Sequence, residues 1–241
     1  MHASLRLTVA LLACAAVGLA SSGPIAPAVQ ENKLGRGASE PKFNWSKAVE
    51  QSFFFLTFQH AFRLTQEKTV DQLGGPFFKD YWRSAKNLGG WEDGDSMFTN
   101  YVAHPMQGAV SGYIQIQNDP RGAALVFGAS DKQYWKSRLR ATAFAALYST
   151  QFELGLYSEA SIGNVGMRPG TMGYVDLVMT PMGGLGWMVG EDALDRFVVE
   201  PMERKWQNRP LTRFLRIAFS PTRSFANVLR FEKPWKRDGR Q

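Results

Sequence analysis

Apolar positions recur at helical spacing along most of this chain, and no run shows the alternation that is typical of β-strands. The segment Ser46–Leu64 has two apolar stripes on nearly opposite sides of a helix. They consist of Val49, Phe53, Leu56 and His60 on one side, and of Phe54, Phe58 and Phe62 on the other. A helix that is apolar on both sides is either buried between layers or lies in lipid.

Two further helices follow from the same pattern. The segment Phe77–Leu88 predicts a short helix, and Asp131–Glu159 predicts the longest one, with a charged first half and an apolar second half. The intervening sequence NLGGWEDGDS is typical of a turn, with Asp95 or Ser96 as the N-cap of the next helix. The prediction is a mainly α protein with a helical, bundle-like domain.

Two long segments are almost free of charge. Residues from Ser96 to Asn118 include no Asp, Glu, Lys or Arg, and Asp176 alone interrupts the run from Met172 to Gly190. Both approach the roughly 20 residues that cross a bilayer. Their Asn, Gln, Thr and Gly content favours buried or interfacial helices over membrane-spanning ones.

The two uncharged segments share a motif. Each has a polar residue, three spacers, a second polar residue, then Pro, Met, one spacer and Gly, so that Asn100 and His104 correspond to Asp176 and Thr180. Residues at i and i+4 share one helix face. The following prolines either kink or break the helix, or occupy the first helical position after an N-cap.

Glycines follow both motifs at four-residue spacing, as Gly108 and Gly112 and as Gly186 and Gly190. Such spacing allows two helix backbones to approach closely. We therefore expect two Pro-broken, Gly-rich helices to pack together and to gather one polar cluster. Its members are Asn100, His104, Asp176 and Thr180. An alternative interpretation is that these residues only cap and crosslink a tight helical core.

The N-terminus resembles an export signal. Residues 1–20 have Arg6 before an apolar run and a Gly-x-Ala ending that suits cleavage after Ala20. A second possibility is a lipoprotein signal of residues 1–13, in which the sequence LLAC makes Cys14 the lipidated N-terminus. Because Cys14 is the only cysteine, no intramolecular disulfide can form. A membrane anchor is disfavoured because the apolar run is only about 14 residues long.

Composition suggests three further parts: a flexible tether at 21–43, a helical domain at 44–203 and a basic aromatic tail at 204–241. The chain carries a net charge of +7, and the tail alone has an excess of +9, which leaves −2 for the rest. Basic and aromatic residues together bind nucleic acid or an anionic lipid surface. Export favours the lipid surface and excludes nucleic acid as the expected partner. The alternative is a tail docked on the domain.

Three blocks in order carry a family resemblance: DGDSMFTNYVAHPMQG, STQFELGLYSE and VDLVMTPMGGLGWMVGE. The chain resembles the bacterial envelope family known as domain of unknown function 3943 over roughly Trp91–Glu191, although Phe152 stands where that family's block has Trp. The resemblance implies an exported or membrane-associated bacterial protein and supplies no activity. The matching positions are Asn100, His104, Pro105, Gly108, Glu153, Asp176, Thr180, Pro181, Gly184 and Glu191.

Candidate chemistry centres on His104, since we interpret His60 as a packed core histidine. Glu153, Asp176 or Glu191 could orient the imidazole and raise its basicity, which would make it a general base. No G-x-S-x-G nucleophile motif, no metal-binding histidine or cysteine spacing and no phosphate-binding loop occurs. One histidine with two or three carboxylates is a chemically possible site for zinc or manganese, but without such spacing we predict neither a metal nor a cofactor. We interpret the acids of EDGDS as a solvated cap.

Two functional hypotheses follow. The first is a non-enzymatic envelope protein, located in the periplasm or at the outer membrane, that binds lipid or an envelope protein partner. The second is a hydrolase or transferase that acts on a lipid-like envelope substrate through His104 and a carboxylate. An enzyme should open His104 to a cleft, whereas a structural cluster should bond its ring nitrogens to backbone groups.

Overall fold

The computed structural model describes residues 42–65, 67–72, 75–162 and 165–240. Within these ranges the extended regular elements are all helices, so the predicted mainly helical class is confirmed. The predicted export signal, Cys14 and nearly all of the predicted tether lie outside the described residues.

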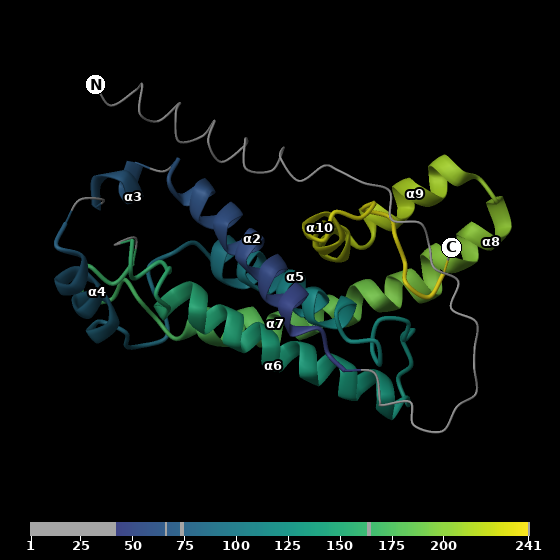
Figure 1. Cartoon of the computed structure of the whole chain (residues 1–241), viewed down its shortest axis with the longest axis horizontal. Helices are drawn as coiled ribbons and strands as arrows, with labels where there is room; N and C mark the ends of the chain where they lie inside the picture. Colours follow the sequence, from purple (N-terminus) through teal and green to yellow (C-terminus); the bar gives the residue numbers. More distant parts are fainter. Residues whose placement is uncertain (1–41, 66, 73–74, 163–164, 241) are drawn as a thin grey trace.

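The centre of the fold is α5 (His104–Gln117), which buries every residue except Met106 and Gln117. It packs against α2 (Trp45–Arg63), α6 (Lys132–Leu154), α7 (Val175–Leu194) and α10 (Pro221–Leu229) (Figure 1). The lack of charge in this segment therefore reflects burial in a protein core. None of the helices in the described residues combines the length and apolar character needed to cross a membrane.

The helices α5 and α7 approach each other through glycine. A Cβ atom added to Gly184 would lie 2.7 Å from the backbone of Gly108, and one added to Gly112 would lie 2.5 Å from the sulfur of Met188. The predicted roles of Gly108 and Gly112 in helix packing agree with this geometry. The predicted roles of Gly186 and Gly190 do not, because a Cβ at either position would meet open space. Gly184, two residues before Gly186, makes the close approach instead.

The two prolines do not break their helices, which corrects one detail of the predicted fold. Pro181 lies inside α7, which continues through it without interruption. Pro105 follows η1 (Thr99–Ala103), a π-helical turn that runs directly into α5. The helix begins where the sequence predicts, since the Ser96 hydroxyl accepts a hydrogen bond from the Thr99 amide at 3.2 Å.

The Phe-rich helix α2 matches its predicted bounds but buries only one face. Phe55, Leu56 and His60 are buried, whereas Phe58 and Phe62 are each more than half exposed. Burial of both apolar faces within the protein is therefore ruled out for this helix, and the alternative of a lipid-facing surface stays open.

The other predicted helices also form. The predicted segment Phe77–Leu88 contains α4 (Phe77–Lys86), which α3 (Glu67–Gln72) precedes. Asp131 caps α6 by accepting the Gln133 amide at 2.8 Å. The helix ends at Leu154, five residues earlier than expected, at a turn around Gly155.

The predicted C-terminal tail is part of the folded domain. It comprises the end of α8 (Glu200–Trp206), which follows η2 (Asp195–Val199), together with α9 (Arg209–Ala218) and α10. Ala226 and Leu229 of α10 belong to the main core. Seven of the eleven basic residues from Arg204 onward form ion pairs with carboxylates. They are Arg204, Arg216, Arg223, Arg230, Lys236, Arg237 and Arg240.

Candidate functional site

His104 is the first residue of α5, and its ring lies between two side chains of α7. Its Nε2 atom is 3.3 Å from Oδ1 of Asp176, and its Nδ1 atom is 3.3 Å from the Thr180 hydroxyl. Asp176 and Thr180 are one turn apart, so they face α5 together. The shared polar cluster predicted from the repeated motif therefore exists, and it is buried.

Glu153 joins the cluster from the last turn of α6. One side-chain ligand atom from each of His104, Glu153 and Asp176 lies within 4.8 Å of the other two, and all three residues are at most 5% exposed. Three helices thus converge on one small polar volume. Two of the three carboxylates proposed from sequence as partners of His104 are in place.

The predicted member Asn100 reaches the cluster through Asp93. The Asn100 amide donates to Oδ1 of Asp93 at 2.8 Å, the Asp95 backbone amide donates to the same atom at 3.0 Å, and Asp93 shares a hydrogen bond with Asp176. Asp93 is only 7% exposed. The interpretation of its EDGDS segment as a solvated cap is therefore wrong for Asp93, because tertiary contacts bury it beside α7.

Burial controls the protonation of this cluster. It lowers the pKa of His104 to about 4, with Arg63 acting in the same direction, and it raises the pKa of Asp176 to about 8, with the charge of Asp93 adding to the effect. Burial and the nearby Asp176 carboxyl also raise the pKa of Glu153. Near pH 7 the imidazole is therefore neutral, Asp176 is largely protonated, and Asp93 carries the negative charge.

An apolar pocket of about 440 Å³ reaches this cluster from the surface. It lies between α2 and the η1–α5 segment, and His104 forms part of its wall. Its apolar lining comes from Phe55, Phe58, Phe62, Phe98, Ala103, Met106, Val110 and Phe152. Arg63 stands on the same wall and forms an ion pair with Glu159 at 2.9 Å.

Glu191 lies in a different place. It is fifteen residues after Asp176 on α7, which corresponds to about 22 Å along the helix axis. Its carboxylate accepts hydrogen bonds from the amides of Thr222 and Arg223 at 2.9 and 3.2 Å, so it caps the start of α10. The candidate role of Glu191 at His104 is therefore wrong.

A second buried charge cluster, which no sequence motif indicated, surrounds Asp192. This carboxylate accepts from the hydroxyls of Tyr113 and Tyr134 at 3.0 and 2.8 Å, and from Nε of Arg138 at 2.7 Å. Arg223 also pairs with it. The partners come from three helices far apart in the chain, so no local spacing could have revealed them.

His60 has the structural role predicted for it. The residue is 1% exposed, its ring stacks on Phe152, and its Nε2 atom donates to the Tyr157 carbonyl at 3.3 Å. Burial lowers its pKa to about 4, so it is neutral near pH 7.

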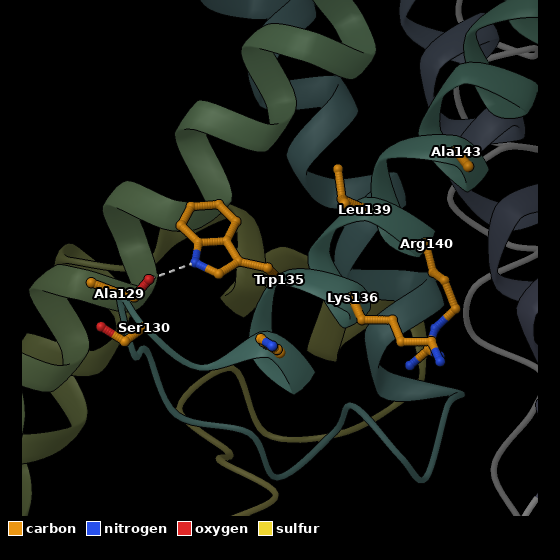
Figure 2. Close-up of a pocket in the computed structure, with 8 residues that line it drawn as sticks. Ala129, Ser130, Trp135, Lys136, Leu139, Arg140 and Ala143 are labelled. Carbon is orange, nitrogen blue, oxygen red and sulfur yellow. Dashed lines mark hydrogen bonds between the residues drawn. The ribbon is translucent and has the colours of Figure 1, made fainter.

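Another hollow, of about 530 Å³, lies at the N-terminal half of α6, far along that helix from Glu153. Figure 2 shows its lining, where the Trp135 indole donates to the Ala129 carbonyl at 2.9 Å and the side chains of Lys136 and Arg140 extend toward each other. It contains no carboxylate or histidine, so it offers no acid–base chemistry comparable with that of the His104 pocket.

No family model, no curated protein and no solved structure matches this chain. The resemblance to domain of unknown function 3943 therefore stays a prediction, and the argument for function depends on the site itself.

Proposed function

We propose that this protein is an exported, membrane-associated envelope protein that binds a lipid-like molecule in the His104 pocket without transforming it. The observation that carries the proposal is a largely apolar pocket whose wall includes His104, the imidazole of the buried polar cluster. Small-molecule sites are typically clefts of about 300–1,000 Å³ with apolar walls and few polar groups. The pocket between α2 and α5 has this composition and a volume of about 440 Å³.

The exposed residues around the pocket support an amphiphilic ligand. Phe58, Phe62 and Phe98 line the pocket and are each about 60% exposed or more. Large exposed apolar patches mark sites of interaction with ligands, proteins or membranes. An acyl chain could enter between these rings, and the polar end of the molecule would meet His104 or Arg63.

The helices α8 and α9 supply the proposed contact with an anionic membrane surface. Trp206, Phe214 and Ile217 are exposed there. Among the described residues, Lys205 and Arg209 have no carboxylate partner, and Arg213 lies over the Trp235 ring at 5.0 Å. Aromatic rings at an interface with cations that reach lipid headgroups are typical of peripheral membrane binding.

Export is proposed from the signal-like residues 1–20 alone. In that setting an envelope lipid is a more suitable partner than nucleic acid. A second envelope protein could share the same exposed aromatic surface.

Ligand binding is tested with the purified mature protein and a fluorescent fatty acid. Met106→Trp places a bulky indole ring in the pocket wall, where it fills part of the cavity, and should weaken fatty-acid binding at least tenfold. Leu139→Trp makes a matched change in the hollow on α6 and should leave the affinity unchanged. Equal affinities of the wild type, Met106→Trp and Leu139→Trp for the fatty acid would rule out the proposed pocket.

Membrane attachment is tested by co-sedimentation with phosphatidylglycerol vesicles. Phe214→Asp should reduce the bound fraction several-fold, because it removes an apolar anchor and adds a negative charge that the anionic vesicle surface repels. Phe78→Asp is the control, since Phe78 is 83% exposed on α4 and lies outside α8 and α9. A loss of binding in Phe78→Asp alone would place the membrane contact elsewhere.

The second candidate function is a hydrolase or transferase acting on the same lipid-like ligand. It is favoured by one observation: the ring nitrogens of His104 meet the side chains of Asp176 and Thr180 instead of backbone groups, and His104 lines the pocket. A neutral imidazole can accept a proton from a water molecule. Release of nitrophenol from a long-chain nitrophenyl ester by the wild type, lost in His104→Asn, would establish it.

A further inference from the structure

Two buried side-chain oxygens in or beside the His104 cluster receive no hydrogen bond from the described residues. Oδ1 of Asp176 is buried and has no hydrogen-bond partner among the described residues, although Nε2 of His104 is 3.3 Å away. Oδ1 of Asn100, one turn before His104, is likewise buried and unpaired within the part of the chain that the structure describes. Buried oxygens without donors are rare and call for an explanation, such as a bound ion.

We infer that His104, Glu153 and Asp176 together bind a divalent transition-metal ion, for which Zn²⁺ is the best match. Zinc binds His nitrogen and Asp or Glu oxygen, and zinc sites that keep an open position use three protein ligands. One imidazole with two carboxylates is such a set. This metal site does not depend on lipid binding in the pocket.

The spacing of the ligand atoms supports the assignment. In tetrahedral zinc sites the bonds to nitrogen and oxygen are about 2.0–2.2 Å, which places neighbouring ligand atoms about 3.3–3.5 Å apart. The separation between His104 and Asp176 is 3.3 Å. The remaining separations are at most 4.8 Å, so rotation of a carboxylate can bring the third ligand into range.

The surroundings of the ligands also fit a metal site. Metal-bound histidines almost always use the second ring nitrogen for a hydrogen bond that fixes the ring. Here Nδ1 of His104 meets the Thr180 hydroxyl at 3.3 Å, which leaves Nε2 facing Asp176. Ser149 donates a hydrogen bond to the backbone carbonyl of Asp176 at 3.2 Å, which holds this part of α7 against α6.

Burial supplies a further reason. The carboxyl groups of Glu153 and Asp176 lie close together in the protein interior, and both residues are at most 5% exposed. Among the described residues no Lys or Arg forms an ion pair with either of them, and Arg63 pairs with Glu159. Two adjacent buried carboxyl groups can ionise together only beside a positive charge, which a divalent cation would supply.

The test uses purified mature protein, stripped of metal with a chelator and exchanged into buffer at pH 7.5. Calorimetric titration with ZnCl₂ should saturate at one ion per chain. At 100 times the dissociation constant, zinc should raise Tm by roughly 5 °C or more. Failure to saturate a single site, or an unchanged Tm, would overturn the inference.

Two nearly isosteric variants locate the site. Asp176→Asn and Glu153→Gln should each weaken zinc binding at least tenfold while remaining folded, because among the described residues neither side chain forms an ion pair with Lys or Arg. Glu191→Gln changes another buried carboxylate of α7 and should bind zinc like the wild type. Unaltered binding in both ligand variants would place the ion elsewhere and contradict the proposal. Met106→Trp should keep zinc affinity, which separates this outcome from that of the lipid test.

Discussion

The helix α7 holds buried carboxyl groups near both ends, and the two ends differ in how these groups are satisfied. Near the C-terminal end, Asp192 receives hydrogen bonds from two tyrosines and from Arg138, and it pairs with Arg223. Near the N-terminal end, Asp176 has one oxygen for which the described part of the chain supplies no hydrogen-bond donor, and it has a neighbouring carboxylate, Asp93. Both residues are buried, at 3% and 5% exposure.

This difference separates a structural cluster from a candidate functional one. A buried carboxylate with a full set of donors holds elements together, and removing it leaves charged partners without a counterpart. A buried carboxyl whose donors are missing adds little to stability and is better explained by a ligand. Burial alone would have assigned the two ends of α7 the same role.

The largest expected effect comes from Asp192→Asn. The substitution removes the counter-charge of Arg138, which is 1% exposed, and of Arg223. We expect a loss of about 3–5 kcal/mol in the free energy of unfolding, because the buried Arg138 loses its counter-charge and Arg223 keeps only its longer ion pair with Asp195 at 3.7 Å. Urea denaturation at pH 7.5 measures it. A loss below about 1 kcal/mol would mean that the Asp192 cluster is not the structural support described here.

The next largest effect concerns His60, a buried imidazole outside both clusters. The pKa of His60 is about 4 in the folded protein against an ordinary value of 6.5. Between pH 4 and pH 6.5 the unfolded state therefore binds a proton at His60 that the folded state does not bind. The contribution of neutral His60 to the free energy of unfolding is about 3 kcal/mol; it is fully present above pH 6.5 and is lost as the pH falls to 4.

His60→Phe isolates this contribution, because it keeps the ring stacked on Phe152 and removes the titrating group. The loss of stability between pH 7 and pH 4 should be smaller in the variant by about 3 kcal/mol. Parallel pH profiles for the two proteins would show that His60 is not buried in its neutral form.

A third prediction tests the contact that brings His104 and Asp176 together. Gly184→Ala would place a methyl group 2.7 Å from the backbone of Gly108. The resulting shift of α5 against α7 should cost about 1–3 kcal/mol and weaken zinc binding. Gly186→Ala, where nothing lies within 4 Å, should instead stabilise the helix by up to about 1 kcal/mol. Similar thermal shifts in both variants would argue against a close glycine contact.

The smallest effect is expected from Asp176→Asn in metal-free protein. Oδ1 has no donor to lose, and the new amide can donate to Asp93. The free energy of unfolding should therefore change by less than about 1 kcal/mol or increase. A destabilisation as large as that of Asp192→Asn would remove the distinction between the two ends of α7.

Sequence patterns predicted several helices well because the spacing of apolar residues and the capping residues are local features of the chain. The Phe-rich helix, the cap at Ser96 and the start of the long helix at Asp131 all follow from residues within a few positions of one another. The repeated motif also predicted the meeting of His104 with Asp176 and Thr180. This succeeded because glycines at helical spacing indicate a close helix pair, although Gly184 makes the contact predicted for Gly186.

Some predictions failed where the contacts are long-range. Glu191 shares a motif block with Asp176, yet a helix carries it about 22 Å away, to the start of α10. The basic tail suggested a separate segment, but its arginines pair with acids of α7, η2 and α8. Composition describes the charge of a segment, whereas the positions of its partners depend on the folded chain.

The sequence by itself thus determined the helical class, the main helix bounds and the pairing of two polar motifs, because each depends on periodicity and local backbone chemistry. The tertiary structure alone decided which of the candidate carboxyl groups reach His104, that Asp93 joins them, that Asp192 receives donors from several helices and that a pocket opens beside the cluster. These features arise where helices from distant parts of the chain converge, and the burial that sets their pKa values exists only in the folded protein.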